Sequence, residues 1–88
     1  MTRYVRKAGA SETVIGDDVF LVAPETREIV HLDVMGAALW RLLETPQSRV
    51  DIVATFAAAF PDMESAQLEV DLSAALQKLV AEGLAGEV

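Results

Sequence analysis

The stretch Glu28–Leu43, EIVHLDVMGAALWRLL, decides the fold because its hydrophobic period changes partway along. Up to Leu32 it is a short run of β-forming residues, which is typical of a strand. After Leu32 the apolar residues recur about every 3.6 positions, which indicates a helix. Asp33 stands at the boundary, where its carboxylate can accept hydrogen bonds from the free backbone N–H groups at a helix start. We therefore predict a strand over Glu28–Leu32 that passes directly into a helix from Val34 to about Glu44.

Two more strands are predicted before this boundary. Thr13–Ile15 leads into the turn-favouring residues Gly16–Asp18, and Val19–Val22 follows with strong β-propensity. Ala23–Arg27 then forms a second turn, in which a proline suits the fixed φ that the turn requires. Together with Glu28–Leu32, these segments predict a three-stranded antiparallel meander.

Two more helices are predicted after it. Ser48, with an acid three residues later, is a start signal for the second helix, and Pro61 ends that helix. The third helix opens near Asp62 to Ser65 and continues to Glu82, with Gly83 where a left-handed residue is expected. The fold class is therefore α+β, a small three-stranded antiparallel sheet followed by three helices, with a winged-helix-like order.

Length and composition allow one domain. The chain has 88 residues, which is too few for a second domain. Of these, 52% are hydrophobic, which is enough to form a buried core. We expect residues 1–88 to form a single domain with its core at about 13–85. A domain of this size buries only about 60–65% of the unfolded surface, so a deep enclosed active site is not expected.

The charge balance bears on partners. Fourteen acidic and seven basic residues give a net charge of −7, which disfavours binding to nucleic acid phosphates and to anionic membranes. Met1–Lys7 is basic but no apolar segment of a secretory signal follows it, and no run approaches the length of a membrane span. We therefore expect a cytoplasmic protein without nucleic acid or membrane partners. Tyr4–Arg6 is separated from the predicted sheet by Ala8–Ser11, and we assign it no strand.

The sequence contains no arrangement of catalytic groups. His31 is the only histidine and there is no cysteine. A zinc site needs several converging ligands and a hydrolytic triad needs a nucleophile beside a base, and a single histidine supplies neither arrangement. The acidic residues occupy turns and helix starts, where they have ordinary structural roles. We expect no enzyme activity, no metal and no cofactor. Trp40 is expected to close the core while its indole N–H reaches a polar partner or water. Its other interpretation is as part of a protein interface, where tryptophan is enriched.

The strand Glu28–Leu32 offers a second kind of site. If it is an edge strand beside the third helix, its free N–H and C=O groups can accept an extended peptide as an added strand. Ile29 or His31 would line one side of the cleft, and Val70 or Ala74 the other. A short, solvated edge is an equally good interpretation. The sequence leaves open which face of this strand is buried, because each face carries apolar residues.

The order and spacing of several segments resemble those of PqqD-like proteins. Ile29–Asp33 with Gly36–Leu43 is similar to the family's strand end and first helix. Val50–Val53, Val70–Leu72 and Leu76–Leu84 are similar to its later helices and its closing Leu-x-x-x-Gly-Leu. The resemblance covers about residues 19–85, and Asp33 replaces the asparagine that is common in the family.

This resemblance implies a non-catalytic peptide chaperone. In that family the domain binds the leader segment of a ribosomally made precursor peptide between the third strand and the third helix, and presents it to a modifying enzyme. In pyrroloquinoline quinone biosynthesis the modifying enzyme is a radical SAM enzyme. The positions that match the family's binding groove, and that we predict as peptide-binding residues, are Glu28, Ile29, Val30, His31, Leu32, Val70, Asp71, Ala74, Ala75 and Lys78.

Two other functions stay open. A winged-helix-like order often indicates DNA binding, but the third helix carries Lys78 as its only cation against Glu69, Asp71 and Glu82. The second apolar stripe of that helix, Ala66, Val70, Ala74 and Ala81, would suit self-association as a homodimer.

Overall fold

The computed structural model describes residues 2–88 and contains the predicted meander. The strands β2 (Ser11–Ile15), β3 (Asp18–Val22) and β4 (Ile29–Leu32) form one antiparallel sheet in the order β2-β3-β4. Gly16 turns the first hairpin with φ 61°, a left-handed conformation that glycine adopts without strain. Glu28 lies directly before β4 and outside the strand, although its carbonyl accepts the Ala23 N–H at 2.9 Å, next to the last β3–β4 pair. The predicted strand is therefore one residue too long.

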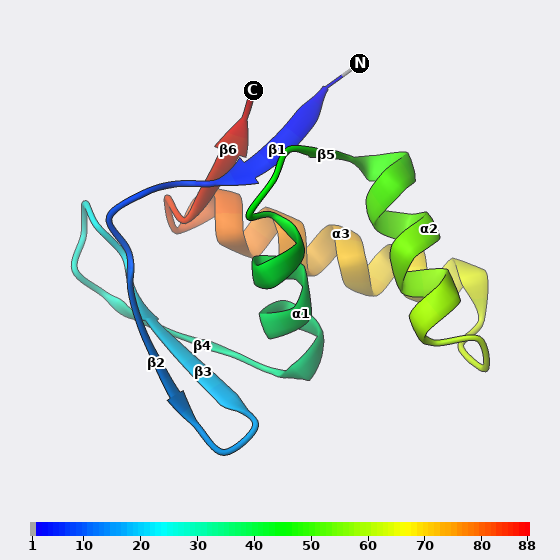
Figure 1. The fold of residues 1–88 in the computed structure, drawn as a ribbon, viewed down its shortest axis with the longest axis horizontal. Helices are drawn as coiled ribbons and strands as arrows, with labels where there is room; N and C mark the ends of the chain where they lie inside the picture. The colour runs from blue at the N-terminus through cyan, green and yellow to red at the C-terminus, as the bar shows by residue number, and fades with distance from the viewer. Residues whose placement is uncertain (1) are drawn as a thin grey trace.

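A second small sheet joins the two ends of the chain. The strand β1 (Arg3–Arg6) lies between β5 (Gln47–Ser48) and β6 (Ala85–Glu87), so the first and last strands of the chain lie side by side (Figure 1). Our prediction of no strand at Tyr4–Arg6 is wrong. The fold also begins before position 13, where we placed the start of the core.

The three predicted helices are α1 (Val34–Leu42), α2 (Arg49–Ala59) and α3 (Ser65–Ala81). The Gly36 N–H donates to the Asp33 carboxylate at 2.8 Å, and the Asp51 N–H donates to the Ser48 hydroxyl at 3.1 Å. Both predicted N-caps are confirmed. Gly83, beyond the end of α3, has φ 73° and so takes the left-handed conformation that its position predicted.

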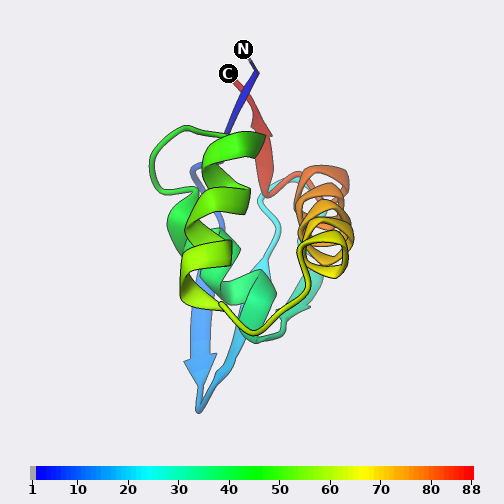
Figure 2. The same ribbon diagram turned by 90° about the vertical axis from the view of Figure 1, so that its right-hand side faces the viewer.

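The core lies where the helices meet the β2-β3-β4 sheet. Viewed from the side, α1 and α2 lie on one side of the molecule and α3 on the other (Figure 2). The indole of Trp40 is buried, and its Nε1 donates to the Glu12 carboxylate on β2 at 2.8 Å, which confirms its predicted place in the core. The buried side chains are mostly aliphatic; the largest that are fully enclosed are Leu21, Leu39, Leu43, Leu68, Leu79, Leu84 and Val19. The α+β class is thus confirmed.

None of the helices described over residues 2–88 has the length and apolar character needed to span a bilayer.

Candidate functional site

The two faces of β4 differ sharply in exposure. Val30 and Leu32 are 6% and 2% exposed and belong to the core, whereas Ile29 is 73% exposed and His31 also faces solvent. Side chains of alternate residues in a strand point to opposite faces. The question that the sequence left open is therefore settled: Val30 and Leu32 point inward, and Ile29 and His31 point outward.

β4 is an edge strand whose free edge faces α3. Its only strand partner is β3, on the side where the Glu28 carbonyl already bonds Ala23. The His31 carbonyl points the other way, because it accepts the Lys78 ammonium of α3 at 2.9 Å. In an antiparallel strand the N–H and C=O of one residue point to the same side, and the side alternates along the chain. The backbone groups of Ile29 and His31 are therefore directed away from β3.

A groove of about 490 Å³ lies between this edge and α3. Six of the ten residues predicted from the sequence line it: His31, Leu32, Asp71, Ala74, Ala75 and Lys78. The other four, Glu28, Ile29, Val30 and Val70, are not among the lining residues. Val30 is buried, Val70 is 63% exposed on α3, and Glu28 lies directly before β4. The predicted strand and helix thus meet, but only part of each contributes side chains to the groove.

Three lining residues were missed by the sequence analysis: Asp33, Met35 and Gly36. Asp33 is the N-cap of α1, and Met35 and Gly36 lie in the first turn of that helix, directly after β4. A Cβ at Gly36 would lie 3.2 Å from the Asp33 carboxylate, so the glycine leaves room for the cap. The signal was available, because a helix that begins directly after a strand must place its first turn at the end of that strand.

The outward face of β4 carries a small polar and aromatic cluster. His31 Nε2 is hydrogen-bonded to the Asp18 carboxylate at 2.9 Å, and the His31 ring lies 5.0 Å from that of Phe20. Phe20 and His31 are opposite each other in the β3–β4 register. The two contacts hold the His31 ring over the outer face of the sheet, so the backbone edge of β4 stays clear of it.

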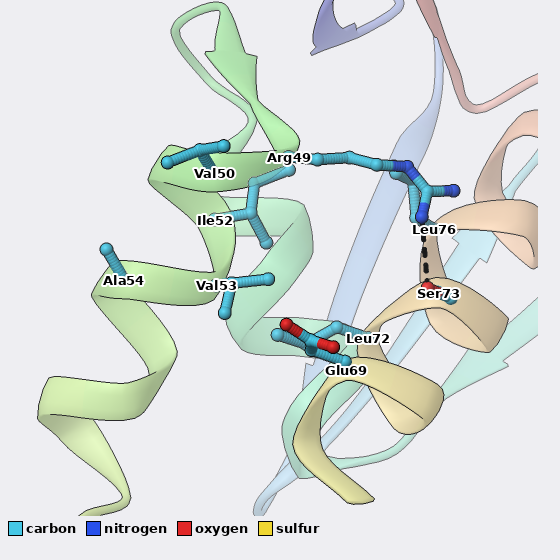
Figure 3. A pocket seen from close by; sticks show the side chains of 9 residues that line it. All are labelled: Arg49, Val50, Ile52, Val53, Ala54, Glu69, Leu72, Ser73 and Leu76. Atoms are coloured by element: carbon cyan, nitrogen blue, oxygen red, sulfur yellow. Dashed lines mark hydrogen bonds between the residues drawn. The ribbon is translucent and has the colours of Figure 1, made fainter. Parts of the chain in front are cut away.

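A second cavity, of about 530 Å³, lies between α2 and α3. Arg49 reaches from the start of α2 across to the Ser73 hydroxyl of α3 at 3.0 Å, above Val53 and Leu72 (Figure 3). Its lining is mainly aliphatic, with Glu69 at the rim. The Arg49–Ser73 bond joins the two helices, which is a structural role.

The groove beside β4 offers hydrogen-bonding groups and charge. Over residues 2–88 there is no group of three or more His, Cys, Asp or Glu side chains placed to hold a metal ion. The groove presents a strand edge without a strand partner, the apolar side chains of Leu32, Met35 and Ala75, two acids (Asp33 and Asp71) and the Lys78 ammonium. These are the elements needed to hold an extended polypeptide by its backbone.

Comparison with known proteins agrees with this geometry. No curated protein sequence matches the chain. The chain is similar to a solved structure described as "TbiB1 in Complex with the TbiA(beta) Leader Peptide", with a TM-score of 0.76 and 26% identity, over 92% of this chain and 93% of that one. The family model of coenzyme PQQ synthesis protein D (PqqD) matches residues 18–85, which include both sides of the groove. With three-quarters or more of the sequence inside that match, the chain belongs to the PqqD family.

Proposed function

We propose that this protein is a non-catalytic adaptor that binds the leader segment of a ribosomally synthesised precursor peptide by strand addition to β4. The observation that carries the proposal is the backbone edge of Ile29 and His31, which has no strand partner and faces α3 across an open groove. A peptide strand in that groove would extend the β2-β3-β4 sheet to four strands. Backbone hydrogen bonds would supply affinity, and the side chains of the groove would supply selectivity.

The similar structure supports this proposal. That protein is described as bound to a leader peptide, and its likeness to this chain extends over nearly the full length of both. Membership of the PqqD family supports it as well. The nature of the ligand, a leader peptide, is thus proposed here by similarity, and its place in the groove is proposed from the strand edge.

We further propose that the adaptor presents its peptide to a modifying enzyme. In the family that enzyme is a radical SAM enzyme in pyrroloquinoline quinone biosynthesis, or a related enzyme in another peptide-modification pathway. A binding protein without catalytic groups of its own needs such a partner to give the bound peptide a chemical fate. The partner enzyme and the peptide are both expected in the cytoplasm.

Self-association is a second candidate function, because one observation favours it. The stripe Ala66, Val70, Ala74 and Ala81 is exposed along α3, and Val70 is 63% exposed. A copy of this chain docked on that stripe would cover part of the groove, so dimer formation and peptide binding would compete. DNA binding has no such support, since Lys78 is the only cation of α3.

A bulky residue in the groove tests the peptide site. We expect Ala74→Tyr to weaken binding of a leader peptide at least fivefold, because Ala74 lines the groove and is exposed, so the ring occupies the path of the added strand without disturbing the core. Ala66→Tyr is the matched control: it is exposed on the same helix but outside the groove. The probes are synthetic leader segments of the precursor peptides encoded beside the gene, with affinity measured by isothermal titration calorimetry.

Two results would count against the peptide site. If Ala74→Tyr and the Ala66→Tyr control bind the leader peptide with equal affinity, the peptide does not bind in the groove. Failure of every leader segment to bind, together with a mass that rises with concentration in sedimentation experiments, would instead favour self-association.

A further inference from the structure

The free edge of β4 is already occupied by a side chain of the protein itself. The Lys78 ammonium donates to the His31 carbonyl at 2.9 Å, a contact between residues 47 positions apart in the sequence. This carbonyl is one of the groups that an added strand would need, because it is directed away from β3. Lysine is one of the residues by which sheet proteins block their exposed edges. A peptide that adds to β4 must therefore displace Lys78 from the carbonyl.

In the free protein the Lys78 ammonium is not paired with an acid, although Asp33 lines the same groove and Glu82 follows Lys78 by one helical turn. Among residues 2–88 the only contact of an acid with a base within 4.0 Å is that of His31 with Asp18. Asp71, the other charged residue that α3 contributes to the groove, accepts a hydrogen bond from Gln67 at 2.9 Å. It also lies two helical turns before Lys78, roughly 10 Å along the axis. Both side chains are thus held apart in the free protein.

Binding would also remove Lys78 from water. The side chain is exposed in the free protein, and a peptide strand lying between β4 and α3 would cover it. Burying an ammonium without a charged or hydrogen-bonding partner is strongly unfavourable. A carboxylate on the peptide would compensate this loss, whereas an uncharged side chain would leave the ammonium with a backbone carbonyl at best.

We infer that Lys78 is a displaceable cap on the β4 edge that selects peptides carrying an aspartate or glutamate close to the position paired with His31. This inference rests on the proposed function and adds a recognition rule to it. In the free protein Lys78 covers the edge. In the complex the same ammonium pairs with the peptide carboxylate, so peptides without that acid have to displace the cap with no gain in return.

A double-mutant cycle tests the rule. The protein variants are Lys78→Met, which removes the ammonium while keeping the length and helix preference of the side chain, and Lys7→Met, a control with the same change of charge on a lysine outside the groove. The peptides are a leader segment that binds the wild-type protein and versions of it in which each Asp or Glu is changed singly to Asn or Gln. Affinities are measured by isothermal titration calorimetry at low and at physiological salt.

We expect the effect of Lys78→Met on affinity to depend on the acid of the peptide. Lys78→Met should bind the parent peptide about three- to tenfold more weakly than wild type, the size expected for loss of one partly exposed ion pair. One amide-substituted peptide should lose the same factor against the wild type, and Lys78→Met should bind that peptide as tightly as wild type or more tightly. Lys7→Met should bind all peptides as the wild type does.

The inference and the proposed function fail in different ways. If leader peptides bind in the groove but Lys78→Met leaves the parent affinity unchanged, or if no single acid of the peptide depends on Lys78, the cap has no role in selection and only the inference is overturned. If no leader peptide binds the wild type, the proposed function fails and the inference fails with it.

Discussion

At the scale of single residues, the burial of Trp40 depends on a contact from a distant strand. The indole is 4% exposed and its Nε1 donates to Glu12 on β2 at 2.8 Å, while the Arg6 guanidinium lies 5.1 Å from the ring centroid. A buried indole N–H without an acceptor loses a hydrogen bond that water would otherwise provide. The Glu12 carboxylate therefore stabilises the packing of β2 against α1.

Removing this acceptor tests the contact. We expect Glu12→Ala to lower the free energy of unfolding by about 0.5–1.5 kcal/mol, because it removes the acceptor of the Trp40 N–H. Glu12→Gln keeps an oxygen acceptor and should lose less. Urea denaturation measures the stability, and the indole N–H resonance in NMR spectra should shift in the alanine variant. If the two variants are equally stable, the hydrogen bond contributes nothing.

The sequence predicted some of these residues and not others. Trp40 was expected to find a polar partner, and the capping roles of Asp33 and Ser48 follow from signals within three residues of each cap. Glu12 was not identified as the partner, because it lies 28 residues away and only the pairing of the sheet brings it close. Local hydrogen bonds could be predicted from local sequence, and long-range ones could not.

At the scale of elements, the same limit explains the strand that was missed. The three helices and the β2-β3-β4 meander have clear periodicity and turn signals of their own. β1 instead pairs with β5 and β6, which are two and three residues long and carry no strand pattern. Tyr4 pairs with both Gln47 and Glu87. A strand whose partners lie so far along the chain cannot be recognised from the residues next to it in the sequence.

Deleting β1 tests its importance. The strand sits between β5 and β6, and the backbone N–H of Arg6 donates to the Leu43 carbonyl at 2.8 Å, so its loss breaks the second sheet and this bond. We expect removal of Thr2–Arg6 to lower the melting temperature by more than about 10 °C, since about 2 kcal/mol shifts a domain of this size by roughly that amount. Removal of Thr2 alone is the control. A melting temperature within about 2 °C of the control would show that the second sheet is dispensable.

Some features of the groove could be predicted from local sequence, and others depend on long-range contacts. The meeting of β4 with α3 agrees with the pattern expected from the sequence, and six of the predicted residues line the groove. The inward face of Val30 could not be predicted, because both faces of β4 carry apolar side chains. The capping of the His31 carbonyl by Lys78 depends on the placement of α3 across the molecule, which no local signal specifies.

At the scale of the whole molecule, the fold leaves one strand edge of its larger sheet facing a helix across an open groove. The sheet has β2 at one edge and β4 at the other, and α3 crosses the molecule beside β4 (Figure 1). The chain carries a net charge of −7, and Lys78 is the only lysine or arginine lining this groove. The net charge disfavours a nucleic acid, and the strand edge without a strand partner favours an extended peptide.

Amide hydrogen exchange of β4, followed by NMR with and without a bound leader peptide, tests strand addition most directly. Val30 and Leu32 direct their N–H groups toward β3 and should be protected in both states. Ile29 and His31 direct theirs toward the groove, so we predict rapid exchange in the free protein and at least tenfold slower exchange when the peptide is bound. If the peptide binds while the Ile29 and His31 amides exchange as fast as before, the peptide does not add to β4, and the central claim is contradicted.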